Sequence, residues 1–299
     1  MPVLAAVEGG GTSFVVAIAS STSPSDVIER AEFPTGDPGE TIGCVCTWLA
    51  AREYDAIGIA SFGPIDLETA SPTYGFITTT PKPGWKYADV LGPIRRVRAV
   101  PFAFDTDVNA PALAEYMHAR RSGETLSSCA YVTVGTGIGV GLVVNGAPVH
   151  GLMHPEGGHV CVPSHEDDRD TGFVGSNPSD TFGGQCAENM ACSVALAKRA
   201  HLESTEVLKH IGESHPVWDT AAHYLGALCA NMILLVSPER VVLSGGVMLR
   251  SALFPRVRAA AQLLLNGYLQ LPQIITQEGI DQYIVPSTWG NDAGLVGAL

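Results

Sequence analysis

Apolar and polar residues alternate along this chain in blocks that predict short strands and helices. Residues 4–19 and 131–146 share one pattern, in which an apolar strand, a Gly/Thr turn and a second apolar strand follow one another. Such matched units indicate two related halves, and we expect a ligand cleft between them. Unbroken small and branched residues at 56–61 and 100–107 predict buried strands, and the second of these ends in carboxylates.

Helical spacing of apolar side chains predicts a helix at 109–121, with Asn109 as a plausible cap. Residues 151–184 are rich in Gly, Pro, His and Asp without periodicity, which is typical of a long functional loop. The later part of the chain is expected to form helices at 187–200, 217–236 and 253–266, strands at 240–245 and 283–287, and a short C-terminal helix. Because strands and helices alternate throughout, the predicted fold class is α/β.

Composition narrows the classes of partner. The chain has 299 residues, 17 Lys and Arg against 30 Asp and Glu, and a net charge of −13. Nucleic-acid binding through phosphate neutralisation needs clustered cations, so we expect no nucleic-acid partner. Arg95, Arg96 and Arg98 form the densest basic cluster, which a solvated helix face explains.

The expected compartment is the cytoplasm. The first residues carry no basic side chain and Glu8 interrupts their apolar run, so they do not resemble a secretory signal. The most apolar later segment, 224–236, is too short to cross a bilayer. The 7 Cys, an odd number in a chain of this length, favour reduced thiols over a disulfide scaffold.

Three glycine turns follow predicted strands. Residues 9–12 read Gly-Gly-Gly-Thr, and 135–137 read Gly-Thr-Gly between the strands of the second matched unit. Backbone N–H groups without neighbouring side chains can bind phosphate oxygens, although a plain hairpin explains either turn alone. A third Gly pair at 245–246 could approach a nucleoside or merely form a turn.

Acidic side chains supply candidate chemistry. Asp107 at a strand end could accept a proton from a substrate hydroxyl, as phosphoryl transfer to an alcohol requires, or it could only cap a helix. Asp105 lies on the same face of the strand, so spacing alone does not choose between the two. In the segment HPEGGH, Glu156 and His159 could bind sugar hydroxyls, and Glu188 could join them.

Together these motifs resemble sugar kinases of the ROK (repressor, open reading frame, kinase) family in the actin-like ATPase superfamily. The similarity runs from Glu8 to the end, through EGGGT, FDTDVNAPALAE, VGTGIGVGLVVNG and LSGGVM. The segments TTPKPGW, HPEGGH and NDAGLVGAL are similar to the fructokinase branch. The resemblance implies a two-lobed actin-like ATPase (ribonuclease H-like) fold with the active site in the interlobe cleft. It divides the chain into a small lobe, 1–110 plus 289–299, and a large lobe, 111–288.

The resemblance also implies an ATP-dependent kinase that phosphorylates the 6-hydroxyl of a hexose, with D-fructose favoured. Asp107 takes the position of the general base, and ATP is expected with Mg²⁺. The sugar ligands implied are Asn109, Glu156, His159 and Glu188. The residues implied for ATP are Glu8, Gly10, Gly11, Thr12, Thr136, Gly137, Gly245 and Gly246.

The chain departs from its relatives at two points. Ser13 stands where the fructokinase branch usually has Lys. Relatives also carry a zinc site, but Asn177 and Asp180 stand here where Cys and His are expected, which leaves His159 and Cys186. Structural zinc prefers four Cys or His ligands, so we expect no zinc, although Cys161 and His165 could complete a different set.

Alternative functions follow from the same resemblance. One is a kinase for mannose or glucose, and another is a homologue that binds sugar without turnover. A sugar-sensing regulator is disfavoured, because the first phosphate motif begins at Glu8 with no room for an N-terminal helix-turn-helix. Relatives are commonly dimers, so a homodimer without membrane partners is expected.

Overall fold

The computed structural model describes residues 2–23, 26–175 and 184–299. Contacts divide the chain into two compact units. Unit 1 consists of Met1–His118, Ala147–Pro155 and Asp292–Leu299, and unit 2 consists of Ala119–Gly146 and Glu156–Asn291. Within the described residues, no helix combines the length and the apolar character that a bilayer span requires.

Unit 1 is built on a five-stranded sheet with the order β3-β2-β1-β4-β5. Its strands are β1 (Leu4–Gly9), β2 (Ser13–Ala19), β3 (Val27–Pro34), β4 (Ala56–Ser61) and β5 (Phe102–Thr106). The first three strands form antiparallel pairs, whereas β1, β4 and β5 run parallel. The carboxyl ends of β1, β4 and β5 therefore meet at one edge of the sheet.

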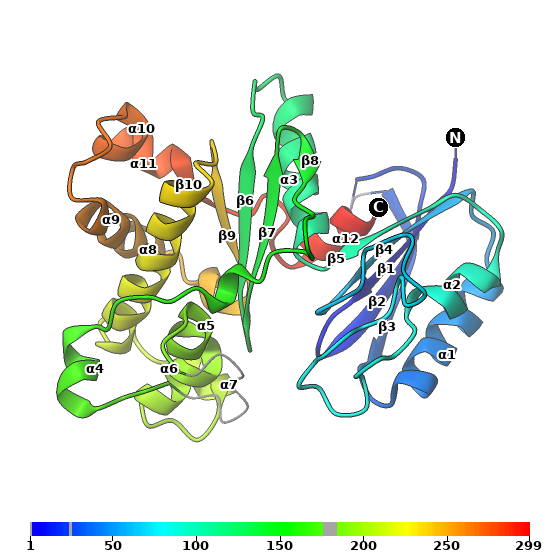
Figure 1. Cartoon of the computed structure of the whole chain (residues 1–299), viewed down its shortest axis with the longest axis horizontal. Helices are drawn as coiled ribbons and strands as arrows, with labels where there is room; N and C mark the ends of the chain where they lie inside the picture. The colour runs from blue at the N-terminus through cyan, green and yellow to red at the C-terminus, as the bar shows by residue number, and fades with distance from the viewer. Residues whose placement is uncertain (1, 24–25, 176–183) are drawn as a thin grey trace. The chain divides into compact units, whose positions relative to one another are not determined.

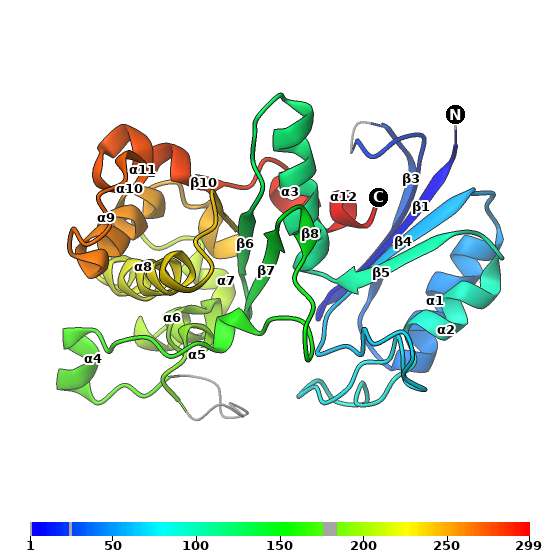
Figure 2. The same cartoon turned by 45° about the horizontal axis from the view of Figure 1, so that its top comes forward.

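Helices cover both faces of this sheet. Helices α1 (Pro38–Ala50) and α2 (Leu91–Val97) lie side by side over one face, above a core that includes Phe14 and Trp85 (Figure 2). The rings of Phe14 and Trp85 stack with centroids 5.4 Å apart. On the other face, small residues of β1 and β2 pack against α12 (Ala293–Ala298). Alanines on this second face keep α12 close to the strand ends.

Unit 2 holds the second matched hairpin in a sheet with the order β10-β9-β6-β7-β8. The strands from unit 2 are β6 (Cys129–Val134), β7 (Ile138–Val144), β9 (Val241–Ser244) and β10 (Ile284–Pro286), and the two-residue β8 (Ala147–Pro148) falls in the range of unit 1. Strands β6 and β7 are antiparallel, and β6, β9 and β10 are parallel. Thr133 pairs with Ser244, so the glycine turns that follow β6 and β9 lie at the same edge.

Helix α8 (Val217–Leu235) of unit 2 buries most of its length and packs beside α9 (Leu253–Leu265) (Figure 1). The remaining elements of the chain are α3 (Asn109–Arg121), α4 (Glu166–Thr171), α5 (Ala187–Ala191), α6 (Ser193–Arg199), α7 (Thr205–Leu208), α10 (Pro272–Ile275), α11 (Gln277–Tyr283) and the 3₁₀ turns η2 (Gly157–His159), η3 (Gly246–Leu249) and η4 (Gly290–Asp292).

The structure corrects two expectations about these elements. The helix predicted at 187–200 is broken at Cys192, whose ψ of 163° is extended. Ser193 there donates its N–H to the carbonyl of Gly135, so the break places the start of α6 against the second glycine turn. The segment predicted as a loop at 151–184 contains η2 and α4, which are too short to show helical periodicity in the sequence.

Candidate active site

The first glycine turn and Asp107 lie at one edge of the unit 1 sheet. Gly9 pairs with Ser61, and Ser61 pairs with Thr106, which aligns the ends of three parallel strands. The N–H of Asp107 donates to the carbonyl of Ser61 at 3.0 Å. This is the edge at which open α/β sheets bind ligands.

The two acidic residues of this segment have different surroundings. Asp105 accepts from the Nδ2 of Asn109 at 3.0 Å, and its second oxygen lies 2.9 Å from the Nε2 of His150. Burial raises the pKa of Asp107 from 3.8 to about 7, and its own backbone N–H partly offsets that rise. A carboxylate with a pKa near neutrality suits a general base, whereas Asp105 is held by fixed partners.

Asn109 begins α3 and is fully buried. Its N–H donates to the hydroxyl of Thr106 at 2.9 Å, so Thr106 rather than Asn109 satisfies the first turn of the helix. The Asn109 side chain instead ties α3 to Asp105 on the preceding strand. This arrangement fixes the short connection that carries Asp107.

Glu8 on β1 is the second carboxyl group with an altered pKa at this edge of unit 1. Burial raises its pKa to about 7, and the negative charge of Asp107 adds to the rise, while Arg30 opposes it. A Cβ atom on Gly294 would lie 1.9 Å from the Oε1 of Glu8, so glycine is required where α12 crosses this carboxyl group. The segment NDAGLVGAL stands out in the sequence, but its pattern gives no sign of this contact.

The glycine turns differ in why they need glycine. A Cβ atom added to Gly11, Gly135 or Gly246 would meet no described atom within 4 Å, and none of the three has a positive φ. Neither packing nor backbone conformation therefore explains glycine at these positions. The N–H of Gly135 already donates to the carbonyl of Gly137 at 2.9 Å. The N–H groups of Gly11 and Gly246, beside open space, fit the approach of phosphate oxygens.

Gly137 and Gly245 are constrained by their own unit. A Cβ on Gly137 would lie 2.6 Å from the Oε2 of Glu188. Gly245 has a φ of 89°, and its Cβ would lie 2.5 Å from the carbonyl oxygen of Val134. The turn after β9 is thus packed against the end of β6, and Thr136 and Gly246 beside it are exposed.

The HPEGGH segment and α5 converge on the start of β7. Gly157 and Gly158 pack against Val140 and Ile138, where any side chain would clash. Glu188, in the first turn of α5, accepts the N–H of Ile138 at 2.8 Å. The structure therefore brings the η2 segment, with Glu156 and His159, next to the helix of Glu188.

His159 and Cys186 lie together, but the described residues around them do not fit a zinc site. The Nδ1 of His159 is 3.6 Å from the Sγ of Cys186, and that sulfur also accepts the N–H of Asn189. In the part of the chain that the structure describes, no group of three His, Cys, Asp or Glu side chains could hold a metal ion. Asn177 and Asp180 lie outside the described residues.

His154 is a site neighbour to which the sequence assigns no role. It is 4% exposed, and its Nε2 accepts the N–H of Ile65 at 3.0 Å. Burial lowers its pKa, which favours the neutral ring that this hydrogen bond requires. The pattern HPEGGH contains no signal that separates such an anchor from a ligand.

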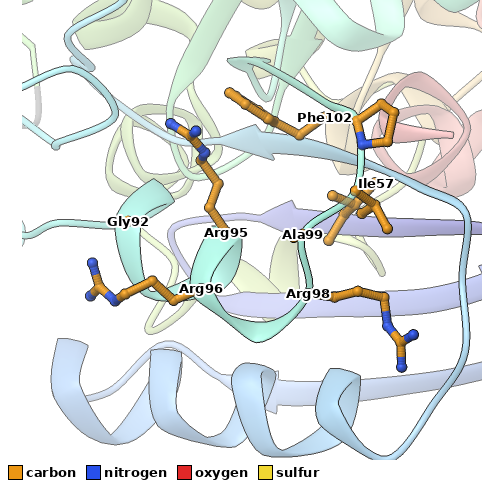
Figure 3. A pocket seen from close by; sticks show the side chains of 9 residues that line it. Ile57, Gly92, Arg95, Arg96, Arg98, Ala99 and Phe102 are labelled. Atoms are coloured by element: carbon orange, nitrogen blue, oxygen red, sulfur yellow. The ribbon is translucent and has the colours of Figure 1, made fainter.

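Unit 1 also has a cavity of about 800 Å³ whose lining includes none of the candidate site residues. It lies by Ile57 and Phe102, at the opposite ends of β4 and β5 from Asp107, and the arginine cluster borders it (Figure 3). The side chains of Arg95, Arg96 and Arg98 point in different directions. Arg95 stacks 4.1 Å over the ring of Phe102, and Arg98 is bonded to Glu53.

Two α/β units of this topology define the two-lobed actin-like ATPase fold, which confirms the expected fold class. Among solved structures, a ROK hexokinase from Thermus thermophilus aligns with a TM-score of 0.73 at 24% identity, covering 99% of this chain and 96% of that one. A ROK glucokinase from Streptomyces griseus, in complex with glucose and AMPPNP, aligns with a TM-score of 0.71 at 19% identity, covering 99% and 97%.

Residues 4–299 match the ROK family, and the chain belongs to that family. A fructokinase of Zymomonas mobilis is 37% identical over 98% of this chain and 94% of its own length. A fructokinase of Streptococcus mutans is 35% identical over 98% of this chain and 94% of its own length. A glucokinase of Halalkalibacterium halodurans is 26% identical over 97% of this chain and 92% of its own length.

Proposed function

We propose that this protein is an ATP-dependent hexose kinase that phosphorylates the 6-hydroxyl of D-fructose. The observation that carries the proposal is Asp107, a carboxyl group with a pKa of about 7 beside a glycine turn at the carboxyl edge of parallel strands. The named activity of the relatives supports fructose over other hexoses. Mannose or glucose is the alternative acceptor.

In the proposed reaction, Asp107 takes the proton of the sugar hydroxyl as the oxygen attacks the γ-phosphorus of ATP. The new bond joins that oxygen to phosphorus, the bond to the β,γ-bridging oxygen breaks, and ADP leaves. A base with a pKa near the working pH combines a sizeable ionised fraction with useful basicity. Mg²⁺, when bound, would offset negative charge on the phosphates.

Backbone groups are the proposed phosphate ligands. The N–H groups of the first and second glycine turns would hold the phosphates, and η3 after β9 would face the nucleoside. The chain offers few cations for this task, so backbone N–H donors are the proposed source of positive potential. The N–H of Gly10 also donates to the carbonyl of Ser13 at 2.9 Å within the first turn. The assigned residues are Gly10, Gly11, Thr12, Thr136, Gly137, Gly245 and Gly246, with Glu8 beside the metal-bound phosphates.

Four polar side chains are the proposed sugar ligands: Asn109 in unit 1, and Glu156, His159 and Glu188 in unit 2. Glu156, His159 and Glu188 would bind hydroxyl groups of the sugar. The carboxylate of Glu188 also accepts the N–H of Ile138. Asn109 would contribute through its amide, which is bonded to Asp105. We also propose a homodimer in the cytoplasm, without zinc and without nucleic-acid or membrane partners.

The test is a coupled assay of ADP release with ATP and Mg²⁺ across fructose, mannose, glucose and amino sugars. We expect fructose to give the highest kcat/KM. A higher kcat/KM with mannose or glucose would favour the alternative acceptor. No sugar-dependent ADP release with any hexose would refute the kinase assignment.

A further inference from the structure

Unit 2 contains a buried ion pair between two of its helices, α4 and α6. The guanidinium of Arg199 on α6 binds both oxygens of Asp168 on α4, at 3.0 and 2.8 Å. The two side chains are 11% and 3% exposed. Tyr224 of α8 donates its hydroxyl to the same carboxylate. We call Asp168, Arg199 and Tyr224 the buried triad.

The buried triad joins three helices and two further segments. The hydroxyl of Tyr224 accepts the N–H of His165 at 3.0 Å, and Arg199 donates to the carbonyl of Met190 in α5 at 2.9 Å. The ring of Phe173 lies 4.2 Å from the guanidinium carbon. The segment from His165 to Phe173 and the end of α5 are therefore fixed to the same charged group.

Both segments lead directly to proposed sugar ligands. Helix α5 carries Glu188 in its first turn. The chain between His159 and α4 pairs with the chain that enters α5, because Ala187 donates to Val160 at 3.0 Å and Val162 donates to Gln185 at 3.2 Å. A shift of α4 or α6 would thus act on the chain next to His159 and on α5, which carries Glu188.

A bidentate buried pair suits such a positioning task. Its geometry is directional, and each charge is satisfied by several partners, so alternative arrangements of the segment would leave a buried charge unpaired. The zinc site expected of relatives in this segment is reduced here to His159 and Cys186, which lie side by side. The buried triad supplies a cross-link that needs no metal ion.

We propose that Asp168 and Arg199 are positioning residues for the hexose, and that their ion pair fixes the His159 and Glu188 segments without zinc. Only the expected effect on the KM for the sugar rests on the proposed function. Its structural part concerns how residues 157–175 and 184–191 are held in the protein without ligands.

The decisive variants are Asp168→Asn, which keeps the shape but removes the charge, and Asp168→Glu as the conservative replacement. The matched control is Asp281→Asn, because Asp281 pairs with Arg258 at 2.6 Å in the same unit but joins α11 to α9. We expect Asp168→Asn to raise the KM for fructose about 10-fold with kcat and the KM for ATP within about 2-fold of the parent. Asp168→Glu should recover part of the loss, and the control should leave both KM values unchanged.

Hydrogen exchange without substrates separates this inference from the proposed function. Amides of 157–175 and 184–191 should exchange faster in Asp168→Asn than in the parent protein and in Asp281→Asn, whether or not the protein phosphorylates fructose. Unchanged exchange in this segment, or equal changes in the control, would overturn the inference. So would one equivalent of zinc per chain by elemental analysis, with a rise in the fructose KM after chelation.

Discussion

Glu8 and Asp107 project from the ends of two parallel strands of one sheet, and burial raises the pKa of each to about 7. The negative charge of Asp107 contributes to the rise at Glu8. Two carboxyl groups that titrate near neutrality at one strand edge are unusual for a purely structural role. Their coupling makes pH the most direct probe of the site.

The first prediction concerns the general base. Asp107→Asn should lower kcat by about 10³-fold, because general-base catalysis by a positioned carboxylate contributes about 10² to 10⁴. Sugar binding, followed by calorimetry, should persist. Asp105→Asn is the matched control on the same strand, and it should retain more activity because Asp105 is bonded to Asn109 and His150. Near-normal turnover in Asp107→Asn would remove the assigned base.

A second prediction concerns the pH profile. The rate should rise with pH through about 7, because Asp107 must lose its proton to act. In Glu8→Gln, one negative charge near Asp107 is removed, so the acidic limb should move to lower pH. A profile of kcat/KM against pH for both proteins checks this. A limb that stays in place would show that the two carboxyl groups do not interact.

Stability should respond to the same group in a defined direction. Because the pKa of Asp107 is raised in the folded protein, the folded state holds a proton that the unfolded chain has released between pH 3.8 and about 7. This contribution is complete below the unfolded pKa and is lost as pH rises through 7. Asp107→Asn should therefore raise the melting temperature by a few degrees at about pH 8 and little at about pH 4. Equal changes at both pH values would contradict the raised pKa.

The glycine turns give a fourth prediction. Gly246→Ala should leave the melting temperature within about 2 °C of the parent, since its Cβ enters open space, but it should raise the KM for ATP. Gly245→Ala is the contrasting variant, because a φ of 89° and the backbone of Val134 oppose any side chain. It should lower the melting temperature. An unchanged KM for ATP in Gly246→Ala would argue against nucleotide at this turn.

Much of the fold follows from patterns in the sequence. The helix expected at 109–121 has those bounds, and the two matched hairpins are present as β1 with β2 and β6 with β7. Their apolar runs are long enough for periodicity to show. The patterns do not predict strand β3, because it is an edge strand with charged residues facing solvent. The predicted lobes, 1–110 with 289–299 and 111–288, stay a prediction.

Fewer features of the candidate active site than of the fold can be predicted from the sequence. Spacing does not separate Asp105 from Asp107, and only the resemblance chooses between them, whereas the structure shows different partners for the two. The buried triad gives no signal, since Asp168, Arg199 and Tyr224 are far apart in the chain and are ordinary residue types in helices. Which charged residues form a buried ion pair depends on the tertiary packing, which the sequence pattern does not show.

Identification of the product formed from ATP and fructose is the sharpest test of the proposed kinase activity. We expect fructose phosphorylated at the 6-oxygen, visible by phosphorus and carbon NMR, with one ADP per sugar phosphate. We also expect Asp107→Asn to form this product at about a thousandth of the rate. ADP release that does not depend on sugar, or no sugar phosphate at all, would contradict it.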